Sequence, residues 1–293
     1  MFKTLPYSLG GYVMLTFILL LFICIFAGLL GSILGIGGGI ILTPVLTLGF
    51  GFDIHHAIGA SIISVIATSS GSAVAYLRDR MLNIRVAMFL EIATTAGAII
   101  GAILVGILSP TLMFILFGSF LLYSAINMVQ KLRSGEKVLK KAQPDYLSDR
   151  LKLNNTYYDK SLKTQIDYQV EKVPAGFSVM FGAGLASGLL GIGSGAFKVM
   201  ALDTFMKMPL KPSSATSNLM MGVTAAASAT VLFFNGSILP EVAAPVAIGV
   251  LIGSTIGAKV MQILPAKWIR IIFIPLLCYI GVQMIFEGFG VKF

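Results

Sequence analysis

The chain has 293 residues, of which 57% are hydrophobic and only 11% are charged. Soluble domains contain about 45–50% apolar and about 25% charged residues, so a soluble protein of this composition could not cover its own surface. The mean hydropathy of +0.93 therefore excludes a cytosolic enzyme and a disordered chain, and it indicates an integral membrane protein. Cys24 and Cys278 lie far apart in apolar segments and indicate neither a disulfide framework nor a metal site.

The net charge of +9 is unevenly distributed along the chain. Residues 131–172 hold ten Lys or Arg and six Asp or Glu, and the other cations flank apolar runs. Such a mixed-sign segment is typical of a solvated linker rather than of a phosphate-binding face, so we expect no nucleic-acid partner. The predicted organisation is a first transmembrane repeat at 1–130, a charged cytoplasmic linker at 131–174 and a second transmembrane repeat at 175–293.

Ten apolar runs follow one another along the chain. They lie at residues 11–34, 39–50, 56–76, 86–108, 112–130, 175–191, 195–206, 213–234, 241–263 and 268–287. Most of them approach the roughly 20 residues that a helix needs to cross a bilayer. The two runs at 39–50 and 195–206 extend only about 18 Å as helices and would stop near the membrane centre. Helices satisfy their backbone hydrogen bonds in lipid, so the predicted fold class is an all-α polytopic membrane protein.

Positive charges set the predicted orientation, because short cytoplasmic connections carry an excess of Lys and Arg. Arg78, Arg80 and Arg85 share one connection, and the charged linker follows two crossings later, so both are placed in the cytoplasm. This scheme requires the segments 11–50 and 175–206 each to enter the membrane and return to the same side. Each segment is therefore predicted to be a broken, re-entrant helix pair.

The two halves of the chain match each other at one fixed offset of 156 residues. The matched pairs include Gly35 and Gly191, Gly37 and Gly193, Ser61 and Ser217, Thr68 and Thr224, Gly97 and Gly253, and Gly101 and Gly257. Each half contains one re-entrant pair and three crossings, an odd number, so the copies should be inverted relative to each other. Inverted repeats are typical of secondary transporters, which bind their solute where the copies meet. The alternative is an ancient duplication kept only for packing.

Each half contains a glycine-rich break within an apolar run. The residues concerned are Gly35, Gly37, Gly38 and Gly39 in the first half and Gly191, Gly193, Ser194 and Gly195 in the second. Glycine is costly inside a helix, so these segments predict unwound turns at membrane depth. A short helix follows each turn, and the free N–H groups at its start favour an anion. The alternative is that the glycines only let helices pack closely.

Polar residues near the breaks extend this candidate anion site. Lys198 follows the second break closely and would add a positive charge, unless its side chain extends to the membrane interface instead. Ser61, Thr216, Ser217 and Asn218 occupy equivalent regions of the two halves and could donate hydrogen bonds to anion oxygens. Hydroxyl groups in membrane helices also often bond to their own backbone, so each one alone is weak evidence.

Two acidic residues are candidates for coupling transport to protons. Glu91 lies within an apolar run and could carry a proton, although a place at the headgroup level is equally open. Asp203 is the second candidate, with pairing to Lys207 one turn on as the alternative. The adjacent His55 and His56 lack the spacing of metal ligands and are interpreted as a solvated loop pair.

Together these motifs make the sequence resemble the sulfite exporter TauE/SafE family, also called the toluene sulfonate uptake permease family. The resemblance rests on the paired segments Gly35–Gly39 and Gly191–Gly195, the small-residue motifs ending in Ser61 and Ser217, and the pairs Gly97/Gly101 and Gly253/Gly257. Pro44 also fits the family pattern, whereas the second half has Lys198 and Met200 in the corresponding region. The resemblance implies transport of sulfur-containing anions such as sulfite or organosulfonates.

The function predicted from the sequence is a secondary transporter, with export favoured, of small sulfur-containing anions such as sulfite or sulfoacetate. An anion channel and a carrier of small carboxylates are the alternatives. No nucleotide-binding or hydrolase motif is present in the sequence, so neither an enzyme nor a cofactor is expected. The expected partners are a small anionic solute and the lipid bilayer of the cytoplasmic membrane, and a homodimer is left open.

Overall fold

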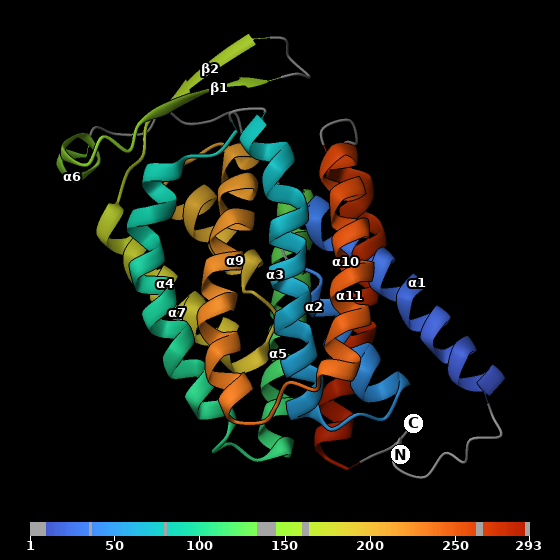
Figure 1. Cartoon of the computed structure of the whole chain (residues 1–293). Helices are drawn as coiled ribbons and strands as arrows, with labels where there is room; N and C mark the ends of the chain where they lie inside the picture. The colour runs from blue at the N-terminus through green and yellow to red at the C-terminus, as the bar shows by residue number, and fades with distance from the viewer. Residues whose placement is uncertain are drawn as a thin grey trace.

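The computed structural model is a bundle of helices with a small hairpin at one end (Figure 1). It describes residues 10–34, 37–78, 81–133, 145–159, 164–261 and 266–290. The N-terminal half runs from residue 10 to 133. Its elements are α1 (Gly10–Leu34), α2 (Gly39–Pro44), the π-helix η2 (Val45–Gly49), α3 (Ile54–Arg78), α4 (Ile84–Val105) and α5 (Pro110–Arg133).

The C-terminal half runs from residue 173 to 290 and repeats this order. Its elements are α7 (Val173–Leu190), α8 (Gly195–Met200), the π-helix η3 (Ala201–Phe205), α9 (Leu210–Phe234), α10 (Pro240–Met261) and α11 (Ala266–Gly288). The helices α8, η3, α9 and α10 each begin and end 156 residues after α2, η2, α3 and α4. The offset found in the sequence therefore also relates the elements of the structure.

Five helices of the described chain are long and apolar enough to cross a membrane, namely α3, α4, α7, α9 and α10. Many of their large apolar side chains are exposed on the outside of the bundle, including Met88, Ile92 and Ile103. Lipid is the environment that such a surface requires. The predicted all-α polytopic membrane fold is confirmed.

The linker contains structure that the sequence analysis did not predict. A short helix, α6 (Tyr146–Arg150), precedes an antiparallel hairpin of β1 (Asn155–Asp159) and β2 (Thr164–Tyr168). Asn83, which caps α4, donates from Nδ2 to Leu153 O at 2.7 Å and to the Tyr168 hydroxyl at 3.1 Å. The linker is thus attached to the connection between α3 and α4, at one end of the bundle (Figure 1).

Equivalent helices of the two halves make equivalent contacts. Helix α1 packs against α10 as α7 packs against α4, and α3 and α5 pack against their own counterparts, α9 and α11. Helices α3 and α9 are antiparallel, because Ser69 Oγ lies 3.5 Å from Leu219 O, whereas His56, nearer the start of α3, approaches Ser237 beyond the end of α9. This is the relation that two inverted copies would show.

The segment before α9 enters and leaves the bundle at the same end. The Glu171 N–H, just before α7, donates to Met206 O, just after η3, at 3.2 Å. Helices α7 and α8 with η3 therefore form a hairpin whose tip is the glycine-rich turn at residues 191–194. Thr216, near the start of α9, accepts a hydrogen bond from the Asn83 N–H at 3.1 Å, so the linker lies at this end too.

The interface between α4 and α7 provides a test of the close packing. A Cβ atom at Gly184 would overlap the Thr94 backbone, whereas a Cβ atom at Gly182 on the same helix would meet nothing within 4 Å. We expect Gly184→Ala to lower the stability of the folded protein by about 1–3 kcal/mol through overpacking. Gly182→Ala is the matched control and should leave the melting temperature in detergent unchanged or slightly raised. Equal melting temperatures for the two variants would contradict the packing described here.

Candidate functional site

The two glycine-rich breaks lie against each other in the interior of the bundle. The Ser61 hydroxyl of α3 donates to Gly191 O at 2.8 Å and lies 3.1 Å from Gly39 O, so it bridges the two breaks. A Cβ atom at Gly39 would be 2.5 Å from Gly191 O, which shows how closely the backbones approach. Gly37–Gly39 and Gly191–Gly195 are buried, while Gly35 lies outside the described residues. The structure thus brings together two breaks that are 156 residues apart in sequence.

The backbone at the breaks requires glycine at several positions. The φ angles are +84° at Gly37, +65° at Gly191 and +69° at Gly193, all in the region that side chains disfavour. Ser194 also has a positive φ of +48°, although it carries a side chain. A non-glycine residue in this conformation costs free energy, and Lys152, Lys172 and Lys207 of this chain adopt similar φ angles outside the breaks.

The two breaks differ in how their polar groups are satisfied. In the first break, the Gly37 N–H donates to Gly31 O at 3.2 Å and the Gly38 N–H donates to Thr68 Oγ1 at 3.3 Å. In the second break, the Ser194 hydroxyl is fully buried and has no hydrogen-bond partner. A buried polar atom without a partner is costly, so the second break carries an unsatisfied hydroxyl.

Lys198 on α8 is completely buried, with an exposed fraction of 0%. Its Nζ donates to Thr224 Oγ1 at 2.6 Å, and this oxygen lies 2.6 Å from Glu91 Oε1. The charges of Lys198 and Glu91 act on each other across this hydroxyl. The burial excludes the alternative in which Lys198 extends to the membrane interface, and it also excludes a solvated position for Glu91, which is 9% exposed.

Sequence reasoning identified Lys198 and Glu91 separately but missed Thr224 as the group between them. The repeat could have indicated Thr224, because it matches Thr68 at the offset of 156 residues. Both side chains accept a hydrogen bond at or next to a glycine-rich break. Thr68 accepts a hydrogen bond from the first break, whereas Thr224 accepts one from the lysine that follows the second. The positions equivalent to Lys198 and Glu91 are Leu42 and Ala247, so the charged pair has no counterpart in the other half.

Three of the remaining predicted residues lie in different places. Ser217 Oγ lies 3.4 Å from Gly195 O, which repeats the contact of Ser61 with Gly39 in the other half. Thr216 faces the start of α4, where it accepts from Asn83. Asp203 is half-buried in η3, so the structure places Glu91 rather than Asp203 beside Lys198.

Asn218 belongs to a second polar group near the end of α1. Its Nδ2 lies 3.4 Å from Ser32 O, which the Tyr76 hydroxyl also approaches at 3.2 Å. Asn218 Oδ1 and the Ser32 hydroxyl are buried without partners. Ser32 and Tyr76 were not predicted from the sequence, since a lone hydroxyl in an apolar run carries no distinctive signal.

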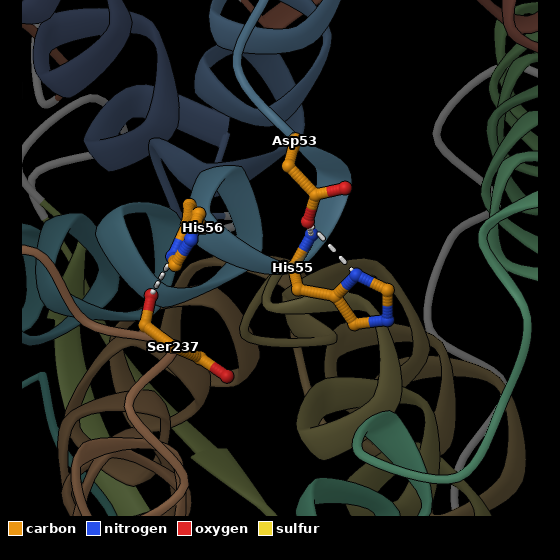
Figure 2. Close-up of polar contacts among 4 residues, drawn as sticks. All are labelled: Asp53, His55, His56 and Ser237. Atoms are coloured by element: carbon orange, nitrogen blue, oxygen red, sulfur yellow. Dashed lines mark hydrogen bonds and ion pairs between the residues drawn. The ribbon is translucent and has the colours of Figure 1, made fainter. Parts of the chain in front are cut away.

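The adjacent histidines lie in the first turn of α3 (Figure 2). Asp53 Oδ1 accepts from the His55 N–H and lies 2.9 Å from His55 Nδ1, and His56 Nδ1 lies 3.2 Å from Ser237 O. Partial burial raises the pKa of Asp53, but the hydrogen bonds from His55 and the charges of both histidines outweigh it and lower the pKa below its ordinary value. These contacts fix the start of α3 against the connection between α9 and α10.

Comparison with known proteins identifies the family. The model of the family described as "Sulfite exporter TauE/SafE" matches residues 20–284. The chain is 25% identical to the probable membrane transporter protein YunE of Bacillus subtilis, over 94% of this chain and 99% of that protein. It is 25% identical to the probable membrane transporter protein MJ0441 of Methanocaldococcus jannaschii, over 91% of this chain and 94% of that protein.

A plant protein shares part of the sequence. The sulfite exporter TauE/SafE family protein 5 of Arabidopsis thaliana is 32% identical over 40% of this chain and 26% of its own length. No solved structure matches the chain significantly. The family model covers most of the chain, and the relatives are named as membrane transporters, in agreement with the apolar helices of the structure. The chain therefore belongs to the sulfite exporter TauE/SafE family of multi-pass membrane transporters.

Proposed function

We propose that the protein is a secondary transporter that exports small sulfur-containing anions, such as sulfite or organosulfonates, across the cytoplasmic membrane. The observation that carries this proposal is the fully buried Lys198 beside two glycine-rich breaks that meet inside the bundle. A buried charge inside a membrane protein is costly and is a functional candidate by default. For a monovalent anion that moves without a coupled ion, an inside-negative potential would contribute about 2.3 kcal/mol per 100 mV in the direction of export.

The proposed anion site lies at the second break, next to Lys198 and the Ser194 hydroxyl. The Ser194 oxygen lacks a partner in the protein, and the Lys198 ammonium has three donors, of which Thr224 accepts one. The N–H groups of Gly193 and Gly195 at the start of the α8–η3 helix would add further donors. A sulfite or sulfonate group has three acceptor oxygens, which suits several donors converging from different directions.

Alternating access is proposed to come from one half rocking against the other as inverted repeats. The antiparallel course of α3 and α9 and the equivalent packing of α1 on α10 and α7 on α4 support this arrangement. In this scheme the linker, Arg85 and the end of η3 face the cytoplasm. The names of the family and of the Arabidopsis relative support sulfite as the solute class, while a carrier of small carboxylates is the second candidate.

The solute class is tested by ligand-induced stabilisation of the detergent-purified protein. A ligand that binds only the folded state stabilises it by about 2.7 kcal/mol when its concentration is 100 times its Kd. We expect sulfite, sulfoacetate or thiosulfate to raise the melting temperature, with sulfate and lactate weaker. A shift with lactate alone would favour the carboxylate alternative, and single-channel currents far above carrier turnover would show an anion channel.

A further inference from the structure

The buried Lys198 of this chain already has a negatively charged neighbour. Glu91 reaches it through Thr224, and the three side chains come from α8, α4 and α9. A solute anion that binds Lys198 would therefore add a second negative charge to a buried site that holds one positive charge. Like charges in a buried site exclude each other unless one of them is neutralised.

We infer that Glu91 takes up a proton when the anion binds Lys198, so that each anion moves together with one proton. This inference rests on the proposed function and deepens it by naming the coupling ion and its site. An O–H bond forms on the Glu91 carboxylate, and the anion takes the place of the Glu91 charge beside Lys198. For a monovalent anion such as isethionate the net charge of the site does not change, and a divalent anion such as thiosulfate adds one negative charge. Release of the anion returns the proton to water.

The hydroxyl of Thr224 can serve both protonation states without movement of the heavy atoms. It has one proton and two acceptors within reach, Glu91 Oε1 at 2.6 Å and Met220 O at 2.8 Å. When Glu91 is ionised, Thr224 donates to it. When Glu91 is protonated, Glu91 donates to the Thr224 oxygen, which also accepts from Lys198, and Thr224 donates to Met220 O. A hydroxyl group with one donor and two lone pairs is satisfied in this second state.

The surroundings of Glu91 contain little else that could balance a change of charge. Its Oε2 is buried without a hydrogen-bond partner, and its Oε1 also lies 3.1 Å from the Thr95 hydroxyl. Helix α7, which packs against α4, contains no Asp, Glu, Lys, Arg or His, and the ionisable residue on α9 is Lys211, in the first turn. An ionised carboxylate with an unpaired oxygen in such surroundings is costly, so protonation of Glu91 relieves that cost when the solute anion balances the charge of Lys198.

Two further titratable groups lie on the elements that hold Lys198. Asp203 is on η3, about one turn beyond Lys198, and is half-buried. Tyr123 on α5 stacks on Phe197 with ring centres 5.5 Å apart, and its hydroxyl lies 3.7 Å from Met200 Sδ. The charge that acts on Lys198 is that of Glu91.

The test is infrared difference spectroscopy of the reconstituted protein before and after the addition of sulfoacetate, isethionate or thiosulfate. The buffer is held near neutral pH, where none of these anions titrates. In the wild type, binding should produce the C=O stretching band of a protonated carboxylic acid. The band should be absent in Glu91→Gln, in which the amide oxygen still accepts from Thr224 and Thr95. Glu241→Gln, which removes an exposed carboxylate at the start of α10, is the matched control and should keep the band.

Two further measurements separate this role from a structural one. Thr224→Ser, which keeps the hydroxyl, should leave the band in place, and Thr224→Val should move it because the hydrogen bond to the acid is lost. Anion affinity of the wild type should rise roughly tenfold for each unit by which the pH falls, as expected for one linked proton. The inference is wrong if the anion binds without producing the band, or if the band persists in Glu91→Gln. It is also wrong if the affinity is independent of pH, or if the band does not move in Thr224→Val. Each of these results leaves the anion site in place. If none of the three anions binds to the wild type, the proposed function itself fails.

Discussion

Replacing Lys198 with leucine is expected to abolish anion binding and transport and to destabilise the protein. Leucine is the residue at the equivalent position 42 of the first half, so its size suits this place in the fold. The substitution removes the buried cation and leaves Glu91 without its charged partner. Breaking a buried charged pair in this way costs about 3–5 kcal/mol. Solute-induced shifts of the melting temperature and flux into proteoliposomes are the measurements.

The double variant Glu91→Ala with Lys198→Leu separates the loss of stability from the loss of function. It places at each position of the charged site the residue found at the equivalent position of the other half, Leu42 for Lys198 and Ala247 for Glu91. Removing both charges of a buried pair is often neutral for stability, so most of the stability should return. Transport should still be absent. Recovery of transport in the double variant would show that Lys198 has only a structural role.

Gly193→Val is expected to abolish transport while the protein remains folded in the membrane. Gly193 has a φ of +69°, and an added Cβ atom would be 2.6 Å from Val65 Cγ1 at the contact between the two breaks. The side chain would therefore both strain the turn and push the second break away from α3. Initial rates of anion flux in proteoliposomes, at matched amounts of inserted protein, are the measurement.

Gly236→Val is the matched control for this substitution. Gly236 has a similar φ of +72°, but it lies in the connection between α9 and α10, where an added Cβ atom meets nothing within 4 Å. It carries the same backbone strain without the contact at the breaks, so its transport should resemble that of the wild type. Equal loss of flux in the two variants would mean that strain, rather than the geometry of the breaks, explains the result.

Much of the architecture follows from the sequence because the membrane leaves few solutions. Long apolar runs must form helices in lipid, and the fixed offset of 156 residues correctly related the bounds of α2, η2, α3 and α4 to those of α8, η3, α9 and α10. The glycine breaks were also visible, since dense glycine within an apolar run is costly unless the chain turns there. The structure adds that both breaks lie against each other, which no local pattern shows.

The charged site was only partly predictable, because its contacts join distant parts of the chain. Glu91 and Thr224 are 133 residues apart, and the threonine is one of many hydroxyl-bearing residues in apolar runs. The asymmetry of the breaks was equally hidden, since Gly38 and Ser194 are equivalent positions but have φ angles of −68° and +48°. The hairpin of the linker was missed because its charges dominate its composition, whereas its stability depends on contacts such as that of Asn83 with Leu153.

The most direct measurement of an anion held at the second break is a crystal structure of the protein with 2-bromoethanesulfonate, in which anomalous scattering locates the bromine. We expect the sulfonate oxygens within hydrogen-bonding distance of Lys198 Nζ and Ser194 Oγ, and the bromine peak close by between the two halves. A peak beside Ser32 and Asn218, or an anion bound only at the surface of a protein that transports it, would contradict this account.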